Sequence, residues 1–366
     1  MQTTEKITGT QLGFLLFSFV VSTIFLTVPG QMVMFAKQDA WISVFPAAAT
    51  GILTIWAMIK LANRYPGMTI IQYSSKIMGN ALGKCLGIYY IFFWYMSISV
   101  MIMQHTLFID TVLLPKTPPI VGGLTLLIFC SLAVIAGIEV IARCGEFLAP
   151  LSIIFLIPLF ILMVGEADSN QLKPILAAGV MPILQGAVTP AGAFMNQVFI
   201  LGWLLPYLNQ PKKARKVSLI ALLSISIIVF SIVILTIMVL GPLTPRLTYS
   251  FLSVIQYIGI VGSFERLEAI AVSVWVTGIF VKISISLFIL SLSISQLIGI
   301  RNYREFVIPI ALLSIIGSVF VFKNGTELRN YIAFIYPSAG FFTQSLIPLA
   351  LLMIDTLKRK VNKSLL

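Results

Sequence analysis

The stretch Thr189-Pro190-Ala191-Gly192-Ala193-Phe194-Met195-Asn196-Gln197 interrupts an otherwise apolar segment with a proline, a glycine and two amides. Proline removes a backbone donor and glycine weakens a helix interior, so a helix is expected to break here. A similar stretch, Val21-Ser22-Thr23-Ile24-Phe25 followed by Thr27-Val28-Pro29-Gly30, lies in the first apolar segment. These two predicted breaks decide the fold, because each lies in a segment long enough to cross a membrane.

Composition places both breaks in a membrane protein. Of the 366 residues, 59% are hydrophobic and 10% are charged, whereas a soluble domain carries about 25% charged residues. The hydropathy pattern predicts about ten transmembrane helices in a single integral membrane domain, with a basic cytoplasmic tail at 358–366. The expected spans are residues 10–36, 40–62, 83–113, 119–141, 146–166, 183–208, 215–241, 264–297, 305–323 and 331–357.

The two breaks occupy matching places in this pattern, since spans one and six each open a group of five. Backbone groups in hydrocarbon must find partners within the protein. Paired broken helices at mid-depth therefore indicate a transporter-type binding site, in which freed amides hold an anionic group and freed carbonyls hold a cation. The interpretation that stays open is a pair of tolerated proline kinks.

The basic residues predict the orientation. Most of the 24 Lys and Arg residues lie in segments that are cytoplasmic if the N-terminus is inside, which places both termini in the cytoplasm. The net charge of +12 therefore reflects topology and predicts no nucleic-acid partner. Lys358, Arg359, Lys360 and Lys363 are expected to anchor the last helix at an anionic lipid surface.

The residue inventory argues against an enzyme. The single histidine, His105, excludes a multi-histidine metal site and a Ser-His-Asp relay, and no phosphate-binding glycine loop is present. Cys85, Cys130 and Cys144 are dispersed, which predicts neither a disulfide framework nor a structural zinc site. We predict no metal and no cofactor, and we expect His105 and Asp110 to face a vestibule or the headgroups.

Lys282 is a charged residue expected deep inside a span. It lies at least 14 residues (~21 Å) from either end of span eight, too far for its side chain to reach an interface. A lysine at that depth costs on the order of 3 kcal/mol, so a cavity, a carbonyl cluster or a carboxylate must offset the charge. We expect Lys282 to line a functional cavity, and the alternative is a structural ammonium bonded to backbone carbonyls.

The run Glu265-Arg266-Leu267-Glu268, followed by Trp275, resembles the Glu-Arg-x-Glu…Trp signature of the endospore germination permeases. These proteins are the B subunits of nutrient germinant receptors and belong to the amino acid–polyamine–organocation superfamily. The resemblance extends over essentially the whole chain. Three more stretches carry it: Leu172-Lys173-Pro174-Ile175-Leu176 with Gly179, Pro182-Ile183 and Gly186; Leu205-Pro206-Tyr207-Leu208-Asn209; and Asp39-Ala40-Trp41.

The resemblance implies an all-α membrane protein with a five-plus-five inverted repeat of the leucine-transporter type, its repeats at about 10–166 and 183–357. In that fold spans one and six unwind around the ligand, and spans three and eight complete the pocket. Relatives commonly have glycines at Ser22-Thr23 and Gly-Glu at Asn196-Gln197, so the identity of a ligand does not transfer between members. The implied ligand-binding residues are Ser22, Thr23, Ile24, Phe25, Phe93, Ser97, Phe194, Asn196, Gln197, Gly278 and Lys282.

The same resemblance implies a receptor subunit in the cell membrane or the spore inner membrane. It would bind a small nutrient, such as an amino acid, sugar or nucleoside, and signal to a larger membrane A subunit and a lipoprotein C subunit to trigger germination. The alternative is a secondary active amino-acid transporter, coupled to a cation or a proton, in which Lys282 supplies the charge that a bound ion supplies elsewhere. The same cavity serves sensing and transport, so fold alone does not separate them.

Overall fold

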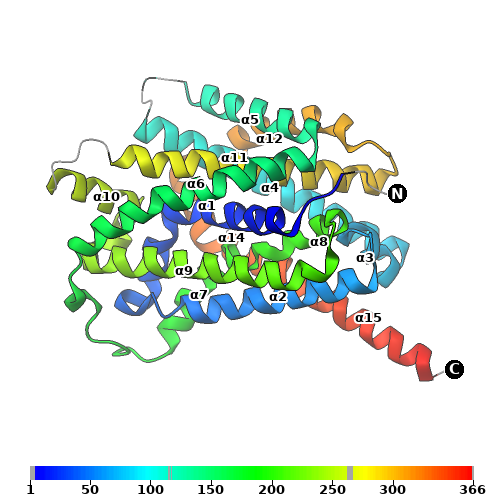
Figure 1. Cartoon of the computed structure of the whole chain (residues 1–366), viewed down its shortest axis with the longest axis horizontal. Helices are drawn as coiled ribbons and strands as arrows, with labels where there is room; N and C mark the ends of the chain where they lie inside the picture. The colour runs from blue at the N-terminus through cyan, green and yellow to red at the C-terminus, as the bar shows by residue number, and fades with distance from the viewer. Residues whose placement is uncertain (1–4, 114–115, 117, 262–266, 365–366) are drawn as a thin grey trace.

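The computed structural model describes residues 5–113, 116, 118–261 and 267–364. Within these residues the secondary structure is helical, apart from one isolated parallel β-bridge between Ile7 and Leu208. Most helices run along the long axis of the molecule, and both chain ends lie at the same end of the bundle (Figure 1). This arrangement fits two termini on the same side of a membrane, while the side itself stays a prediction.

The first half of the chain begins with a helix fixed by its own sequence. The Thr8 side chain accepts from the backbone of Gln11, and the Gln11 side chain accepts from the backbone of Thr8, which caps the helix. The helices of this half are α1 (Gly9–Ala36), α2 (Val44–Arg64), α3 (Ile70–Met78), α4 (Asn80–Val112), α5 (Pro119–Ala136) and α6 (Ile138–Gly165).

The second half begins with the 3₁₀ turn η2 (Ser169–Leu172), which precedes the 13-residue helix α7 (Met181–Ala193). Its last span consists of two 6-residue α-helices and one of 18 residues, joined by two π-helical turns. Its elements are α7 (Met181–Ala193), η3 (Met195–Ile200), α8 (Leu201–Leu204), η4 (Leu205–Tyr207), η5 (Pro211–Lys213), α9 (Ala214–Leu240), η6 (Gly241–Arg246), α10 (Ser250–Val261), α11 (Glu268–Ile298), η7 (Tyr303–Phe306), α12 (Val307–Phe320), α13 (Gly325–Asn330), η8 (Tyr331–Ile335), α14 (Tyr336–Phe341), η9 (Phe342–Leu346) and α15 (Ile347–Ser364).

The apolar helices establish a multi-pass membrane protein. In the described residues eight stretches are long and apolar enough to cross a membrane, and the bent helix α1 brings the number to nine. The helix α5 occupies the place predicted for span four, but its apolar part, Ile120–Ala136, is shorter. The exact number of ten spans therefore stays a prediction.

The structure moves the expected boundary between spans four and five. We placed the end of span four at residue 141, but α5 ends at Ala136 and α6 begins at Ile138, on either side of Gly137 with φ 111°. The charged residues that suggested a loop lie in the first turns of α6, where Glu139 accepts from the Lys6 backbone at 2.7 Å. The helices α3 and α10 were not expected, because their 9 and 12 residues are too short for a span.

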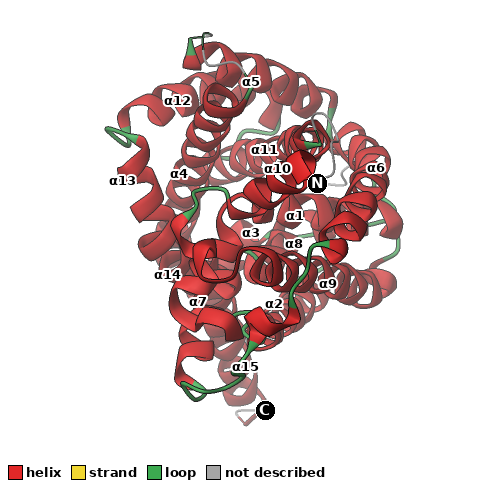
Figure 2. Cartoon of the chain, turned by 90° about the vertical axis from the view of Figure 1, so that its left-hand side faces the viewer, coloured by secondary structure: helices red, strands yellow, loops and turns green. Residues whose placement is uncertain are grey.

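The centre of the bundle is formed by the helices that carry the predicted breaks. The helix α1 packs against α6, α7, α9 and α11, and seen end-on α1, α8 and α11 lie in the middle while α5, α12 and α15 lie at the rim (Figure 2). Every residue from Thr189 to Leu204, which includes the break, is buried. Both interrupted segments are thus covered by protein, as broken helices at membrane depth require.

Candidate functional site

The first break is a bend in α1. The parts Gly9–Ile24 and Val28–Asp39 meet at an angle of 66°, and Pro29 lies just beyond the bend. A proline in a helix interior removes a hydrogen bond and clashes with the preceding turn. The bend lies at the position predicted from the sequence. Phe25 falls within it, and the Phe25 side chain lies outside the described part of the chain.

The second break interrupts span six. The helix α7 ends at Ala193, Phe194 adopts φ −138° and ψ −63°, and the chain continues as the tighter 3₁₀ turn η3. The Gln197 side chain donates to the Ala193 carbonyl. An amide side chain thereby satisfies a carbonyl at the end of α7.

Lys282 of α11 joins the two breaks. Its ammonium donates to Thr23 Oγ1 of α1 at 2.7 Å and to Gln197 Oε1 of η3 at 3.0 Å. The Nζ atom also lies 5.1 Å from the centre of the Phe19 ring, a distance that suits a cation–π contact. The Lys282 side chain is only 3% exposed. One buried charge therefore connects three central segments of the bundle.

The groups around Lys282 are neutral. Its described hydrogen-bond partners are a hydroxyl and an amide oxygen, and neither Thr23 nor Gln197 carries a charge. A buried cation needs compensation by polar groups or by an opposite charge. The two oxygens and the Phe19 ring supply dipoles, and an anionic group beside Lys282 would supply the opposite charge that its described partners lack.

Close packing holds α1 against α11 beside this site. A Cβ atom added to Gly278 would lie 2.6 Å from Ser22 Cβ, which leaves no room for a side chain. Ser22 is buried and donates to the Phe19 carbonyl at 3.3 Å, and Ile24 is fully buried. Ser22 and Gly278 therefore form a packed contact between α1 and α11, one turn before Lys282.

The helix α4 contributes an aromatic wall. Phe93 is buried with its ring centre 6.0 Å from that of Phe199. The Ser97 hydroxyl donates to the Phe93 carbonyl at 2.8 Å within its own helix. The Tyr336 hydroxyl lies near the side chains of Ser97 and Gln197. Through Tyr336, the predicted residue Ser97 is linked to the polar group around Lys282.

Asn196 lies on a different side from Gln197. Thr54 Oγ1 of α2 lies 3.1 Å from both Asn196 Oδ1 and Ser345 Oγ, and its single hydrogen can be donated to either oxygen. Asn196 Nδ2 is buried, and in the described structure it has no hydrogen-bond partner. Phe194 is buried at the break itself. The structure brings Thr23, Gln197 and Lys282 together and places Asn196 in a second polar contact against α2.

Sequence reasoning missed several residues of this centre. Phe19 lies one turn before the predicted break, Thr54 lies in span two, and Tyr336 lies in the last span. The sequence does contain a pattern that could have indicated Tyr336. Like the break in span six, this stretch combines a proline with small residues, in Tyr336-Pro337-Ser338-Ala339-Gly340. Two π-helical turns also flank α14, and such turns are frequent at functional sites.

Two of the family motifs meet at the C-terminal end of α1. Both Asp39 carboxylate oxygens accept from the backbone of Leu176 at 3.1 Å, and the Gln38 side chain donates to the Pro174 carbonyl at 2.7 Å. Asp39 is almost completely buried. These bonds hold the segment that leads into α7 against the C-terminal end of the first broken helix.

The Glu-Arg-x-Glu…Trp motif is only partly described. Trp275 is buried in α11 with its ring centre 5.4 Å from that of Phe108, and Glu268 begins α11, where an acidic residue complements the helix dipole. Glu265 and Arg266 lie outside the described residues. The role of Glu265 and Arg266 as part of the family motif therefore stays a prediction.

A cavity of about 320 Å³ lies between α4, α5 and α11. His105 and Asp110 line it together with Val276, as expected for a vestibule. His105 is 4% exposed, and its Nδ1 has no partner among the described residues. No group of three or more His, Cys, Asp or Glu side chains that could hold a metal occurs in the part of the chain that the structure describes.

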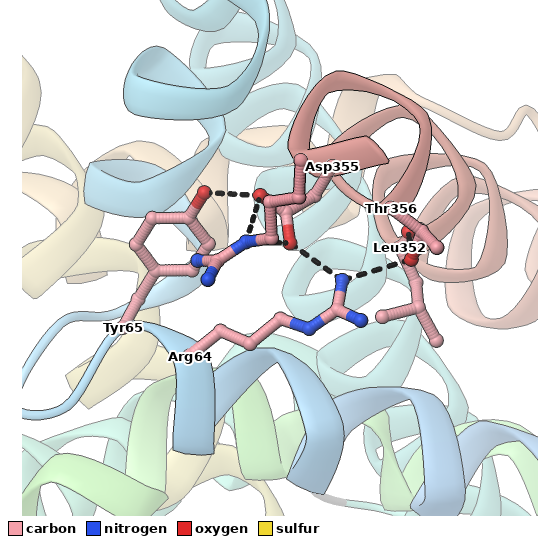
Figure 3. A network of polar contacts seen from close by, with 6 residues as sticks. Arg64, Tyr65, Leu352, Asp355 and Thr356 are labelled. Atoms are coloured by element: carbon pink, nitrogen blue, oxygen red, sulfur yellow. Dashed lines mark hydrogen bonds and ion pairs between the residues drawn. The ribbon is translucent and has the colours of Figure 1, made fainter. Parts of the chain in front are cut away.

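The basic tail contacts protein rather than standing free. It continues α15, where Asp355 pairs with Arg64 of α2 at 2.6 Å and with Arg359 at 3.0 Å (Figure 3). The Tyr65 hydroxyl also donates to Asp355, and burial followed by this hydrogen bond raises the pKa of Tyr65. Lys358 donates to the Ile77 carbonyl at 2.7 Å. Lys358 therefore binds the rest of the bundle, whereas Arg359 pairs with Asp355 of its own helix and lies 5.6 Å from the centre of the Tyr65 ring.

Comparison with solved structures identifies the fold. MhsT in complex with L-phenylalanine is similar with a TM-score of 0.68 and 14% identity, over 95% of this chain and 88% of that one. A Na⁺-coupled sialic acid symporter is similar with a TM-score of 0.62 and 13% identity, over 96% and 78%. The predicted fold class, an all-helical membrane protein of the leucine-transporter type, is confirmed.

Comparison of sequences identifies the family. Spore germination protein KB of Bacillus subtilis (strain 168) is 28% identical over 362 residues, which are 97% of this chain and 96% of that protein. Spore germination protein YndE of the same organism is 26% identical over 300 residues, 80% and 81% of the two chains. A family profile described as "Spore germination protein" matches residues 6–326. The chain therefore belongs to the spore permease family of germination proteins, as its sequence motifs indicated.

Proposed function

We propose that this protein is a non-enzymatic subunit of a germinant receptor that binds a small nutrient between its two broken helices. The observation that carries the proposal is the position of Lys282. Its buried ammonium bonds Thr23 on the first broken helix and Gln197 on the second. A charge held at this depth by neutral partners is costly, and a binding role accounts for its presence.

The candidate ligands are amino acids, sugars and nucleosides. A carboxylate suits the site best, because it can pair with the Lys282 ammonium and with amides freed where the helices break. The proposed contacts are Ser22, Thr23, Ile24, Phe25, Phe93, Ser97, Phe194, Asn196, Gln197, Gly278 and Lys282.

Ligand binding would act on the connection between the breaks. A carboxylate beside Lys282 competes with the Thr23 hydroxyl and the Gln197 amide oxygen for the ammonium protons. The ligand then favours the arrangement of α1 and η3 that it binds more tightly. In the spore inner membrane this shift would be read by a larger membrane A subunit and a lipoprotein C subunit.

The proposal is tested by the germination response of spores that carry Lys282→Met. Methionine has a similar length and no charge, so spores should assemble the receptor and lose their response to the nutrient. Lys116→Met removes an exposed lysine and should leave the response unchanged. A normal nutrient response in Lys282→Met spores would refute the proposed role of the ammonium.

A second candidate function is transport of an amino acid. It is favoured by the likeness of the fold to that of MhsT over 95% of the chain. In that case Lys282 would take the place of a coupled cation. Counterflow into liposomes that contain this protein alone separates the two functions, because saturable uptake that is lost in Lys282→Met would support the transporter and argue against a pure receptor.

A further inference from the structure

A long groove separates α2 from α9 on the outside of the bundle, away from the candidate ligand site. Its apolar part has a volume of about 570 Å³ and is lined by side chains that include Val44, Ala48 and Phe230. A second hollow of about 520 Å³ continues it and shares Ile52 and Leu219 with the first. From Val44 to Asn63 the groove spans about 28 Å of α2, close to the thickness of the hydrocarbon core of a bilayer.

The two ends of this groove differ in chemistry. The end near the chain termini is lined by Lys60, Asn63, Arg215 and Trp56, with Lys60 Nζ 4.8 Å from the centre of the Trp56 ring. No acidic residue lines either hollow. In the described part of the chain neither Lys60 nor Arg215 forms an ion pair. Two cations and a tryptophan therefore stand where an apolar groove reaches the membrane surface.

We propose that this groove binds an anionic phospholipid. The headgroup phosphate lies between Lys60 and Arg215, with Asn63 as a further donor, and an acyl chain follows the apolar part toward Val44. Basic pockets between membrane helices bind anionic headgroups by this chemistry. A lipid from one leaflet fits the groove, because its phosphate can pair with the two cations at the charged end. An apolar helix of a partner protein would leave both cations without a counter-charge.

The bound lipid braces the helices that hold the second break. Thr54 Oγ1 of α2 lies 3.1 Å from Asn196 Oδ1 of η3, and α9 packs along both α1 and α2. A lipid seated between α2 and α9 therefore contacts the outer side of the elements that support the ligand site.

The test uses the purified full-length protein with phosphatidylglycerol and, as the neutral comparison, phosphatidylcholine with the same acyl chains. Phosphatidylglycerol should raise the unfolding temperature saturably, and phosphatidylcholine should not. Lys60→Gln and Arg215→Gln should each weaken the effect about fivefold, the factor expected for one basic residue at a lipid surface. Lys216→Gln is the matched control, because Lys216 is exposed one residue further along α9 and does not line the groove.

A second variant tests the acyl-chain part. Ala48→Trp fills the apolar hollow while both cations stay in place, so it should reduce phosphatidylglycerol binding although the charge is unchanged. The unfolding temperature without lipid checks that each variant folds. The proposal would be overturned if the two lipids raised the unfolding temperature equally, or if Lys216→Gln weakened the phosphatidylglycerol effect as much as Arg215→Gln does. Either result would mean that the lipid is attracted to the surface in general and not to this groove. Unchanged phosphatidylglycerol binding by Ala48→Trp would also overturn the proposal. The apolar groove would then be a candidate contact for a transmembrane helix of a partner protein.

Discussion

Thr23 and Gln197, which lie on the two broken helices, accept hydrogen bonds from the same ammonium. Lys282 Nζ is 2.7 Å from Thr23 Oγ1 and 3.0 Å from Gln197 Oε1. The two breaks are therefore joined by a single side chain on α11, in addition to the packing of α1 against α7 and η3. Any ligand that takes one of these bonds alters both breaks, and the predictions below test the packing and the chemistry that support this coupling.

Gly192→Ala should strongly destabilise the protein. A Cβ atom at Gly192 would lie 1.8 Å from the Pro337 carbonyl oxygen, so α7 and α14 would have to separate. Overpacking a tight core lowers the free energy of unfolding by about 1–3 kcal/mol. Because this contact is with backbone and is very close, we expect a loss of about 3 kcal/mol. Thermal unfolding measures it. Gly165→Ala is the control, because nothing lies within 4 Å of the added atom. A Gly192→Ala protein as stable as Gly165→Ala would contradict the close approach of the two helices.

Ala193→Leu should block ligand binding. Ala193 is the last residue of α7, is 2% exposed and accepts from the Gln197 side chain at the break. A leucine here intrudes on the space beside Gln197, and the response to the nutrient should be lost at an unchanged level of membrane protein. Ala49→Leu, on the exposed surface of α2, should respond normally. A full response in Ala193→Leu would show that this part of the break does not line the site.

Asp355→Asn should loosen the last helix. Asp355 is 4% exposed and accepts from Arg64, Tyr65 and Arg359. Hydrogen bonds to a charged group contribute about 1.5–3 kcal/mol, and the partly buried Arg64 would lose its counter-charge. We expect unfolding to become easier by about 2 kcal/mol, compared with no change for Glu166→Gln at an exposed position. Equal unfolding temperatures for the two variants would mean that this network does not stabilise the contact between α2 and α15.

The breaks and Lys282 could be predicted from the sequence because their causes are local. Proline and glycine disfavour a helix wherever they occur in its interior, and a lysine in the middle of a span is costly in any membrane fold. The structure places bends or 3₁₀ turns at both predicted stretches. The family motifs likewise gave the correct fold class.

The partners around Lys282 could not be predicted, because they depend on tertiary packing. Asn196 and Gln197 are neighbours, yet Asn196 contacts α2 and Gln197 contacts α11. In a 3₁₀ turn successive side chains are about 120° apart, so adjacent residues face different helices. The sequence gives the position of the break but not the rotation of the turn that follows it. Tyr336 is more than 130 residues from Gln197, and only folding brings the two together.

The most direct test of the account is ligand binding to the purified protein. Thermal unfolding is measured with a panel of amino acids, sugars and nucleosides for the unmodified protein, Lys282→Met and Lys116→Met. We expect one class of nutrient to raise the unfolding temperature of the unmodified protein and of Lys116→Met in a saturable way. We expect no stabilisation of Lys282→Met, which should itself fold at least as well because a buried charge has been removed. Equal stabilisation of all three proteins by the nutrient would contradict a ligand site at Lys282.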